Sequence, residues 1–104
     1  MKYRLHKSPE ADRDTDEIAD YLTERSVRTA ERFLNQVEST LERIRLDPGL
    51  GMHLKIEEPQ LYGVLWHRVE GFPNHLIFFQ VEDDSICVLR ILHGARDWKS
   101  ELDR

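Results

Sequence analysis

The sequence predicts a single α+β domain, in which a small, mainly antiparallel sheet of four strands is backed by an amino-terminal helical hairpin. Two patterns predict it. Apolar residues recur with helical spacing in the first half of the chain, and two apolar strands separated by a polar turn follow in the second half. The expected order is strand, helix, helix, strand, strand, strand. A chain of 104 residues has room for one domain, so residues 1–104 are expected to fold as a unit.

The chain opens with a predicted strand over residues 2–7, where apolar and polar residues alternate. Ser8 can cap the helix that follows, and Pro9 suits its first position. This first helix is expected from about Pro9 to about Arg25. Its apolar stripe is narrow and its outer face is acidic, which we interpret as a solvated surface rather than a cation site. The acids of that face are Asp12, Asp14, Asp16, Glu17 and Asp20.

A second helix is predicted from Arg28 to Leu46. Ser26 is its candidate cap, and the sequence Asp47-Pro48-Gly49 ends it. Only a few residues separate the two helices, so they are expected to pack as an antiparallel hairpin. The apolar face of this helix consists of Ala30, Phe33, Leu34, Val37, Leu41 and Ile44.

The second half of the chain is expected to form three strands joined by polar turns. In order, the predicted segments are a loop over residues 49–60, a strand over 61–70, a turn over 71–74, strands over 76–81 and 86–92 joined by a turn over 82–85, and a short helical turn over 96–102.

One face of this sheet is expected to stay open, because a helical hairpin covers only one face. Alternation along the last strand places Arg90 on the same face as Ile86, Val88 and Leu92. Burying an unpaired guanidinium is unfavourable, so this face is expected to be the less buried one. A partner helix or strand could cover such a surface. Alternatively, Arg90 pairs with a nearby carboxylate such as Glu70 or Glu82.

Composition limits the classes of function. The net charge is −5 and neither half is basic, which argues against broad, strong binding of nucleic acid. The lone Cys87 lies in an apolar run and is expected to be buried. The sequence has neither an apolar span of membrane length nor a signal pattern, so we expect a cytoplasmic protein without a membrane partner.

The sequence predicts no metal or cofactor. Its five histidines lack the short, fixed spacing of zinc ligands. The serines have no nucleophile-elbow context, and no glycine-rich phosphate loop follows a strand.

The last two strands carry a family resemblance. Residues 71–79 read GFPNHLIFF and residues 88–97 read VLRILHGARD. These two sequence segments resemble the ParE branch of the RelE/ParE superfamily, the toxins of bacterial type II toxin–antitoxin pairs. The resemblance implies a small twisted sheet backed by a helical hairpin. It also implies an inhibitor that poisons DNA gyrase by binding, without catalysis of its own. Such toxins are neutralised by a cognate antitoxin, ParD-like or similar, in a hetero-oligomer, and they serve in plasmid stabilisation.

On that resemblance, the important surfaces are the sheet face around Arg90 and the tail from His93 onward. The candidate partner-binding residues are Arg90, Leu92, His93, Arg96, Asp97 and Trp98. Arg96 and Asp97 could instead form a local salt bridge. Trp98 could anchor a partner, but we predict that it plugs the core beneath the helices.

Relatives in the RelE-like branch cut messenger RNA on the ribosome, which is the alternative function. Its candidate catalytic residues are Arg68, His75, His93 and Arg96. Against it, Leu102 replaces the tyrosine that those enzymes often carry, and Arg68 is the only cation of its strand. A third possibility is an inactive homologue that only binds antitoxin.

Overall fold

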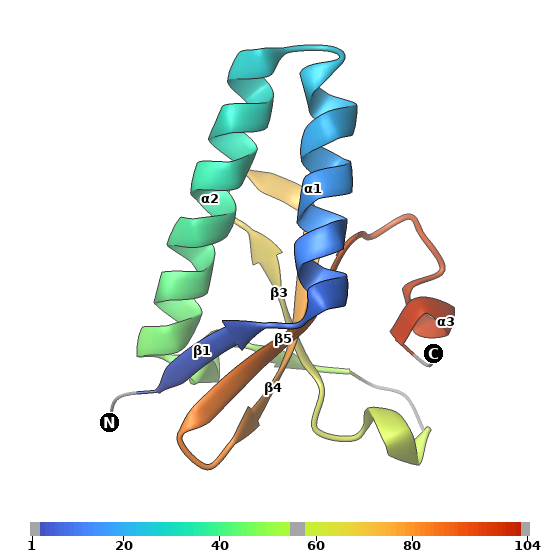
Figure 1. The fold of residues 1–104 in the computed structure, drawn as a ribbon. Coiled ribbons are helices and arrows are strands. Elements are labelled where there is room, and N and C mark those ends of the chain that lie inside the picture. Colours follow the sequence, from blue (N-terminus) through green and yellow to red (C-terminus); the bar gives the residue numbers. More distant parts are fainter. Residues whose placement is uncertain (1–2, 55–57, 103–104) are drawn as a thin grey trace.

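The computed structural model describes residues 3–54 and 58–102. Its elements confirm the predicted α+β class and the helical hairpin (Figure 1). They are β1 (Arg4–Lys7), α1 (Pro9–Thr23), α2 (Val27–Leu46), the 3-10 turn η1 (Pro48–Leu50), β2 (Met52–His53), the 3-10 turn η2 (Pro59–Leu61), β3 (Leu65–Val69), β4 (Phe72–Glu82), β5 (Ser85–His93) and α3 (Trp98–Leu102). The predicted start of the first strand, at residue 2, lies outside the described residues. No helix in the described ranges is long and apolar enough to cross a membrane.

The sheet has five strands rather than the four predicted, in the order β1-β5-β4-β3-β2. β1 pairs in parallel with β5, and the other neighbours are antiparallel. The added strand, β2, lies in the segment that we predicted as loop. Two residues are too few to show an alternating pattern, so pairing with β3 alone defines this strand. The residue before this strand is Gly51. A side chain there would clash, because an added Cβ would lie 2.5 Å from the ring of Phe79.

The turn between β3 and β4 is tighter than predicted. Glu70 and Gly71 make it, whereas Phe72, Pro73 and Asn74 already belong to β4. Gly71 has φ +76°, in the left-handed region that glycine enters at little cost. The prediction of a turn over residues 71–74 was therefore wrong at three of its four positions.

α1 and α2 stand on one face of the sheet and bury the larger of two apolar clusters beneath them (Figure 1). α2 contributes Phe33, Val37, Leu41 and Ile44, which confirms most of its predicted apolar face; Leu34 is 39% exposed. The sheet contributes Val69, Ile77, Phe79, Ile86, Val88 and Ile91.

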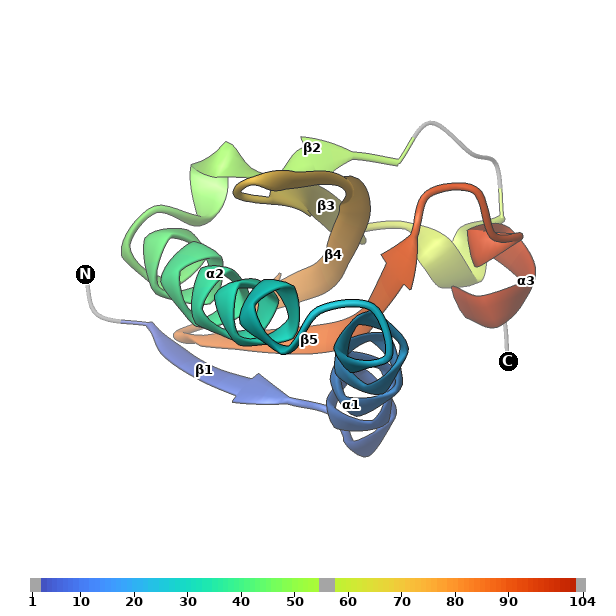
Figure 2. The same ribbon diagram turned by 90° about the horizontal axis from the view of Figure 1, so that it is seen from above.

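The opposite face is not open, contrary to prediction. A second cluster there is built around buried Phe78 and Leu92, with Trp66, Leu89, Trp98 and Leu102 packed against it. The Trp98 ring stacks on Phe78 with centroids 5.7 Å apart. Figure 2 shows α3 beside the turn of residues 59–61 and away from α2. Trp98 is thus a plug, as predicted, but on the side of the sheet away from the helices.

A β-bulge in β5 explains why simple alternation predicted the wrong face for Ile86 and Val88. Phe78 pairs with Arg90 whereas Phe79 pairs with Val88, so Leu89 is an extra residue in β5. Ile86 and Val88 therefore pack beneath the helices, while Leu92 packs in the second cluster. These three residues do not share one open face with Arg90.

Cys87 also departs from prediction. It is half-buried, with His6 opposite it in the register of β1 and β5. Burial and the nearby carboxylates of Glu82 and Glu10 raise the pKa of its thiol. The neutral thiol is thereby favoured over the reactive thiolate.

Candidate functional site

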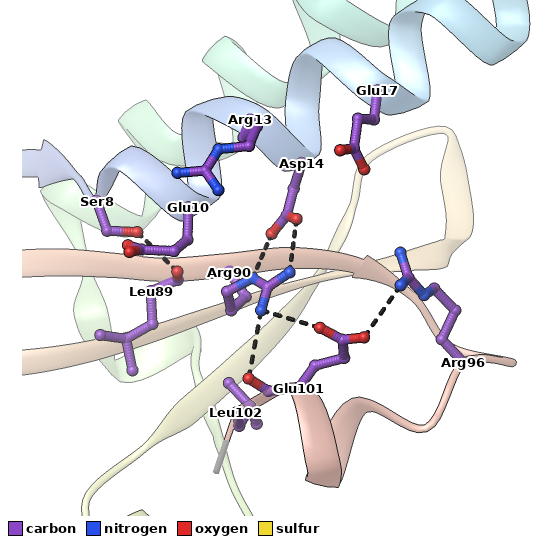
Figure 3. Close-up of a pocket in the computed structure, with 10 residues that line it drawn as sticks. All are labelled: Ser8, Glu10, Arg13, Asp14, Glu17, Leu89, Arg90, Arg96, Glu101 and Leu102. Carbon is purple, nitrogen blue, oxygen red and sulfur yellow. Dashed lines mark hydrogen bonds and ion pairs between the residues drawn. The ribbon is translucent and has the colours of Figure 1, made fainter. Parts of the chain in front are cut away.

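Two adjoining pockets lie between α1, the end of β5 and the carboxy-terminal segment. The first, about 670 Å³ in volume, is lined mainly by charged side chains (Figure 3). The second, about 480 Å³, has more apolar lining, including Ile18 and Leu22. Asp14, Glu17 and Arg96 line both pockets. We call the two pockets together the α1–tail groove.

A buried ion pair forms the floor of this groove. The Nε and Nη2 atoms of Arg90 donate to the two carboxylate oxygens of Asp14 at 2.7 and 2.8 Å (Figure 3). The backbone amide of Ile91 donates to the same carboxylate at 3.0 Å. The Asp14 hydrogen bonds raise the pKa of Arg90, so its guanidinium stays charged. Arg90 is therefore paired, although with neither Glu70 nor Glu82; Glu70 pairs with Arg43.

The Glu101 carboxylate joins α3 to this pair. Its Oε2 accepts from Arg90 Nη1 at 3.2 Å, and its Oε1 accepts from Arg96 Nη2 at 3.1 Å. Arg90 Nη1 also donates to the Glu101 carbonyl at 3.3 Å. The local Arg96–Asp97 salt bridge considered above is not formed. Asp97 instead accepts from the Ser100 hydroxyl at 2.7 Å, and this bond lowers the pKa of the Asp97 carboxyl.

Ser8 fixes the start of α1 to the bulge in β5. Its Oγ accepts from the amide of Ala11 at 3.0 Å, as an N-cap, and donates to the Leu89 carbonyl at 2.7 Å (Figure 3). Its own amide donates to the Val88 carbonyl at 2.9 Å. The bulge thus serves as the attachment point that places the first turn of α1 at one end of the groove.

Two histidines lie at the other end of the groove. His75 of β4 is opposite His93 of β5, with ring centroids 5.1 Å apart. His75 also packs against the ring of Phe33, and its buried Nδ1 has no hydrogen-bond partner among the described residues. Burial, and secondarily the nearby His93, lower the pKa of His75. His93 Nδ1 accepts from the amide of Ala95 at 3.0 Å, which places its ring proton on Nε2.

The structure brings together only part of the predicted catalytic set. His75, His93 and Arg96 line the second pocket. Arg68 lies apart, because its guanidinium covers the ring of Trp66 at 5.1 Å, on the side of the sheet away from α2. Within the described residues, no three His, Cys, Asp or Glu side chains are placed to hold a metal ion.

The candidate partner-binding residues differ in how accessible they are. Arg96 and Asp97 are exposed, and His93 is half-buried. Leu92 is buried, and Trp98 is half-buried against Phe78. Of this set, the tail residues are thus the more accessible. Their role in binding stays a prediction.

Asp14 and Glu101 are the site residues that sequence reasoning missed. Asp14 was assigned to the solvated face of the first helix, yet it is only 5% exposed. A signal was present, because Asp14 falls at helical spacing between Ala11 and Ile18, within the apolar stripe. An acid in such a stripe indicates a buried cationic partner. Glu101 carries no comparable signal, because its contact depends on how the tail folds back.

Comparisons with known proteins cover most of the chain. Residues 5–98 match a protein family described as the ParE toxin of the type II toxin–antitoxin system parDE. No curated protein sequence matches.

Solved structures share the fold. A chain of the chromosomal ParDE toxin–antitoxin system from P. aeruginosa superposes with a TM-score of 0.71 at 22% identity, covering 88% of this chain and 96% of that one. A chain of the toxin–antitoxin complex RelBE2 from Mycobacterium tuberculosis gives 0.63 at 19% identity, covering 89% and 99%. A chain of the YoeB dimer from Staphylococcus aureus gives 0.58 at 18% identity, covering 86% and 94%.

Proposed function

The chain belongs to the ParE toxin family of type II toxin–antitoxin systems, and from this premise we propose that it inhibits DNA gyrase by binding and is neutralised by a cognate antitoxin. The inhibitor acts in the cytoplasm and has no catalytic step of its own. Its contact surface for gyrase is the exposed tail around Arg96 and Asp97, next to the α1–tail groove.

The observation that carries this proposal is the charge of the first pocket, where four carboxylates face three arginines and two of those arginines are already paired. Asp14 and Glu101 bond the Arg90 guanidinium, and Glu101 also bonds Arg96. Glu17 lines both pockets without an ion pair among the described residues. An RNA phosphate there would meet more carboxylates than arginines, and Arg13 is the one arginine lining the first pocket without an ion pair among the described residues. The groove therefore offers little cationic stabilisation for phosphodiester cleavage. A binding role is compatible with these charges.

The antitoxin is proposed to occupy the α1–tail groove and form a hetero-oligomer. The chains similar in fold include members of a ParDE system and of a RelBE2 complex. We therefore propose a ParD-like or similar antitoxin. The groove offers apolar contacts from Ile18, Tyr21 and Leu22, beside charged ones from Glu17 and Arg96. Such a mixture suits a protein segment.

The test is a supercoiling assay with purified gyrase, relaxed plasmid and ATP. The protein is expected to inhibit supercoiling and to leave linear plasmid after detergent and protease treatment. Preincubation with the antitoxin encoded beside it is expected to restore supercoiling. Unchanged supercoiling, while cells still die on expression, would contradict gyrase as the target.

Ribosome-dependent RNA cleavage is the second candidate, because His75, His93 and Arg96 line one pocket. Primer extension on ribosome-bound messenger RNA tests it directly. Cuts that appear with the protein and disappear with antitoxin would favour this function. Harmless expression without antitoxin, with intact antitoxin binding, would favour an inactive homologue.

A further inference from the structure

The Glu101 carboxylate lies between two guanidinium groups that come from different segments. Arg90 projects from β5, and Arg96 lies in the segment between β5 and α3 (Figure 3). Arg90 Nη1 bonds one carboxylate oxygen at 3.2 Å and Arg96 Nη2 bonds the other at 3.1 Å. Glu101 thus occupies the place of a bound anion.

The Arg90 half of this arrangement does not depend on Glu101. Asp14 takes the Nε and Nη2 atoms of Arg90 in a two-point contact, which leaves Nη1 to point into the groove. Asp14 is itself fixed by the amide of Ile91. These bonds join α1 to β5 directly, so Arg90 stays oriented when α3 moves.

Glu101, in contrast, sits on a short element. α3 has five residues, and a helix of this length is not stable by itself. It is held by the Trp98–Phe78 stack, by the Lys99–Glu58 ion pair and by Glu101 itself. Arg96 is 51% exposed, so competing groups can reach the site from solvent.

We infer that Arg90 and Arg96 form a carboxylate-binding site, that Glu101 is its resident occupant, and that an aspartate or glutamate of a protein partner replaces Glu101 when the partner docks in the α1–tail groove. The inference goes beyond the proposed function, because it holds whether or not gyrase is the target. Displacing Glu101 would also remove one of the contacts that hold α3 against the second apolar cluster.

The charges around the site favour a protein carboxylate over nucleic acid. Glu10 and Glu17 line the same pocket and form no ion pair among the described residues, and they outnumber Arg13, the one further arginine of the lining. They would repel successive phosphates of a nucleic acid, whereas a single carboxylate is matched by the two arginines. The adjoining pocket, lined by Ile18 and Leu22, can take apolar side chains of the same partner.

The first test uses the full chain and two small anions. Succinate and inorganic phosphate are titrated while NMR follows the side-chain resonances of Arg90 and Arg96, in the wild type and in Glu101→Gln. Glu101→Gln removes the negative charge that lies between the two arginines. Succinate is therefore expected to bind this variant at least about tenfold more tightly than it binds the wild type. Glu58→Gln is the matched control, because it removes one charge near α3 without freeing either arginine.

Three outcomes would overturn the inference: equal succinate affinity in wild type and Glu101→Gln, an equal gain in Glu58→Gln, or a response to phosphate alone, which would point to a nucleic-acid partner. The amide spectrum of each variant reports its folding. Adding Arg96→Gln to Glu101→Gln must abolish the gain, which keeps the test decisive if α3 detaches.

The second test addresses the protein partner. A displayed library of random peptides is selected on Glu101→Gln and on Glu101→Gln/Arg96→Gln. Peptides with an acidic residue next to apolar residues are expected to be enriched on the first variant and not on the second. Equal enrichment of acidic peptides on both variants, or none on either, would overturn the proposed occupant.

Discussion

The Asp14 carboxylate bonds both the side chain of Arg90 and the backbone amide of Ile91. One buried side chain of α1 therefore accepts from three N–H donors of β5, which belong to two residues just past the bulge. The pair fixes where α1 lies against the sheet, and thereby the width of the groove between α1 and the tail.

Asp14→Ala is expected to lower the free energy of unfolding by about 3 kcal/mol, because it leaves the Arg90 guanidinium without its main partner. Arg90 is only 17% exposed, so water replaces little of the lost contact. Urea denaturation followed by circular dichroism measures the change. Asp16→Ala is the control, since Asp16 is exposed on the same helix and its loss should change stability by less than about 0.5 kcal/mol. Equal losses for the two variants would contradict the role assigned to Asp14.

The fold was predictable where a pattern is long and regular. The apolar spacing of α2 and the serine caps place both helices within two residues of their observed ends. The features of the fold that could not be predicted from the sequence are those that depend on pairing between strands. β2 is two residues long, and the extra residue Leu89 in β5 leaves no mark on composition. That single residue reversed the expected faces for Ile86 and Val88.

The candidate site was predictable only in part, for a related reason. The tail motif led to His93 and Arg96, which do line the groove. The two carboxylates of the site come from other elements: Asp14 of α1 bonds Arg90, and Glu101 of α3 bonds both Arg90 and Arg96. Such contacts depend on the tertiary structure. Of the two carboxylates, only Asp14 could have been recognised in the sequence, as an acid within an apolar stripe.

Ser8→Ala is expected to destabilise the protein more than Ser26→Ala. Both serines cap a helix, and the loss of a cap costs about 1 kcal/mol. Ser8 also donates to the Leu89 carbonyl, so its loss should cost about 1 kcal/mol more. Thermal and urea unfolding of the two variants give the comparison. A Ser26 effect as large as that of Ser8 would show that the bond to the bulge contributes nothing.

Stability is expected to fall below about pH 6.5 because of His75. Burial lowers its pKa in the folded state, so the unfolded chain binds a proton first as the pH falls. The stabilisation is fully present above the unfolded pKa and is lost through the window between that value and the lower folded one.

Urea midpoints at pH 5.5, 6.5 and 7.5 measure this dependence. His75→Phe should flatten it, because the variant cannot titrate and keeps a ring against Phe33. His53→Gln is the control, since His53 is exposed and should leave the slope unchanged. A slope that persists in His75→Phe would assign the proton to another group.

Alanine variants of Arg96 and Arg68 distinguish gyrase inhibition from RNA cleavage, because the two arginines lie on different surfaces of the protein. Arg96 lines the groove, whereas Arg68 covers Trp66 on the side of the sheet away from α2. Arg96→Ala is expected to weaken both gyrase inhibition and growth arrest by about tenfold, and Arg68→Ala to change neither. Both side chains are largely exposed, so unfolding free energies should stay within about 0.5 kcal/mol of the wild type.

The assays are run without antitoxin, because Arg96 also belongs to the proposed carboxylate site. Loss of toxicity in both variants, together with loss of RNA cleavage, would instead indicate that both arginines contact a nucleic-acid substrate.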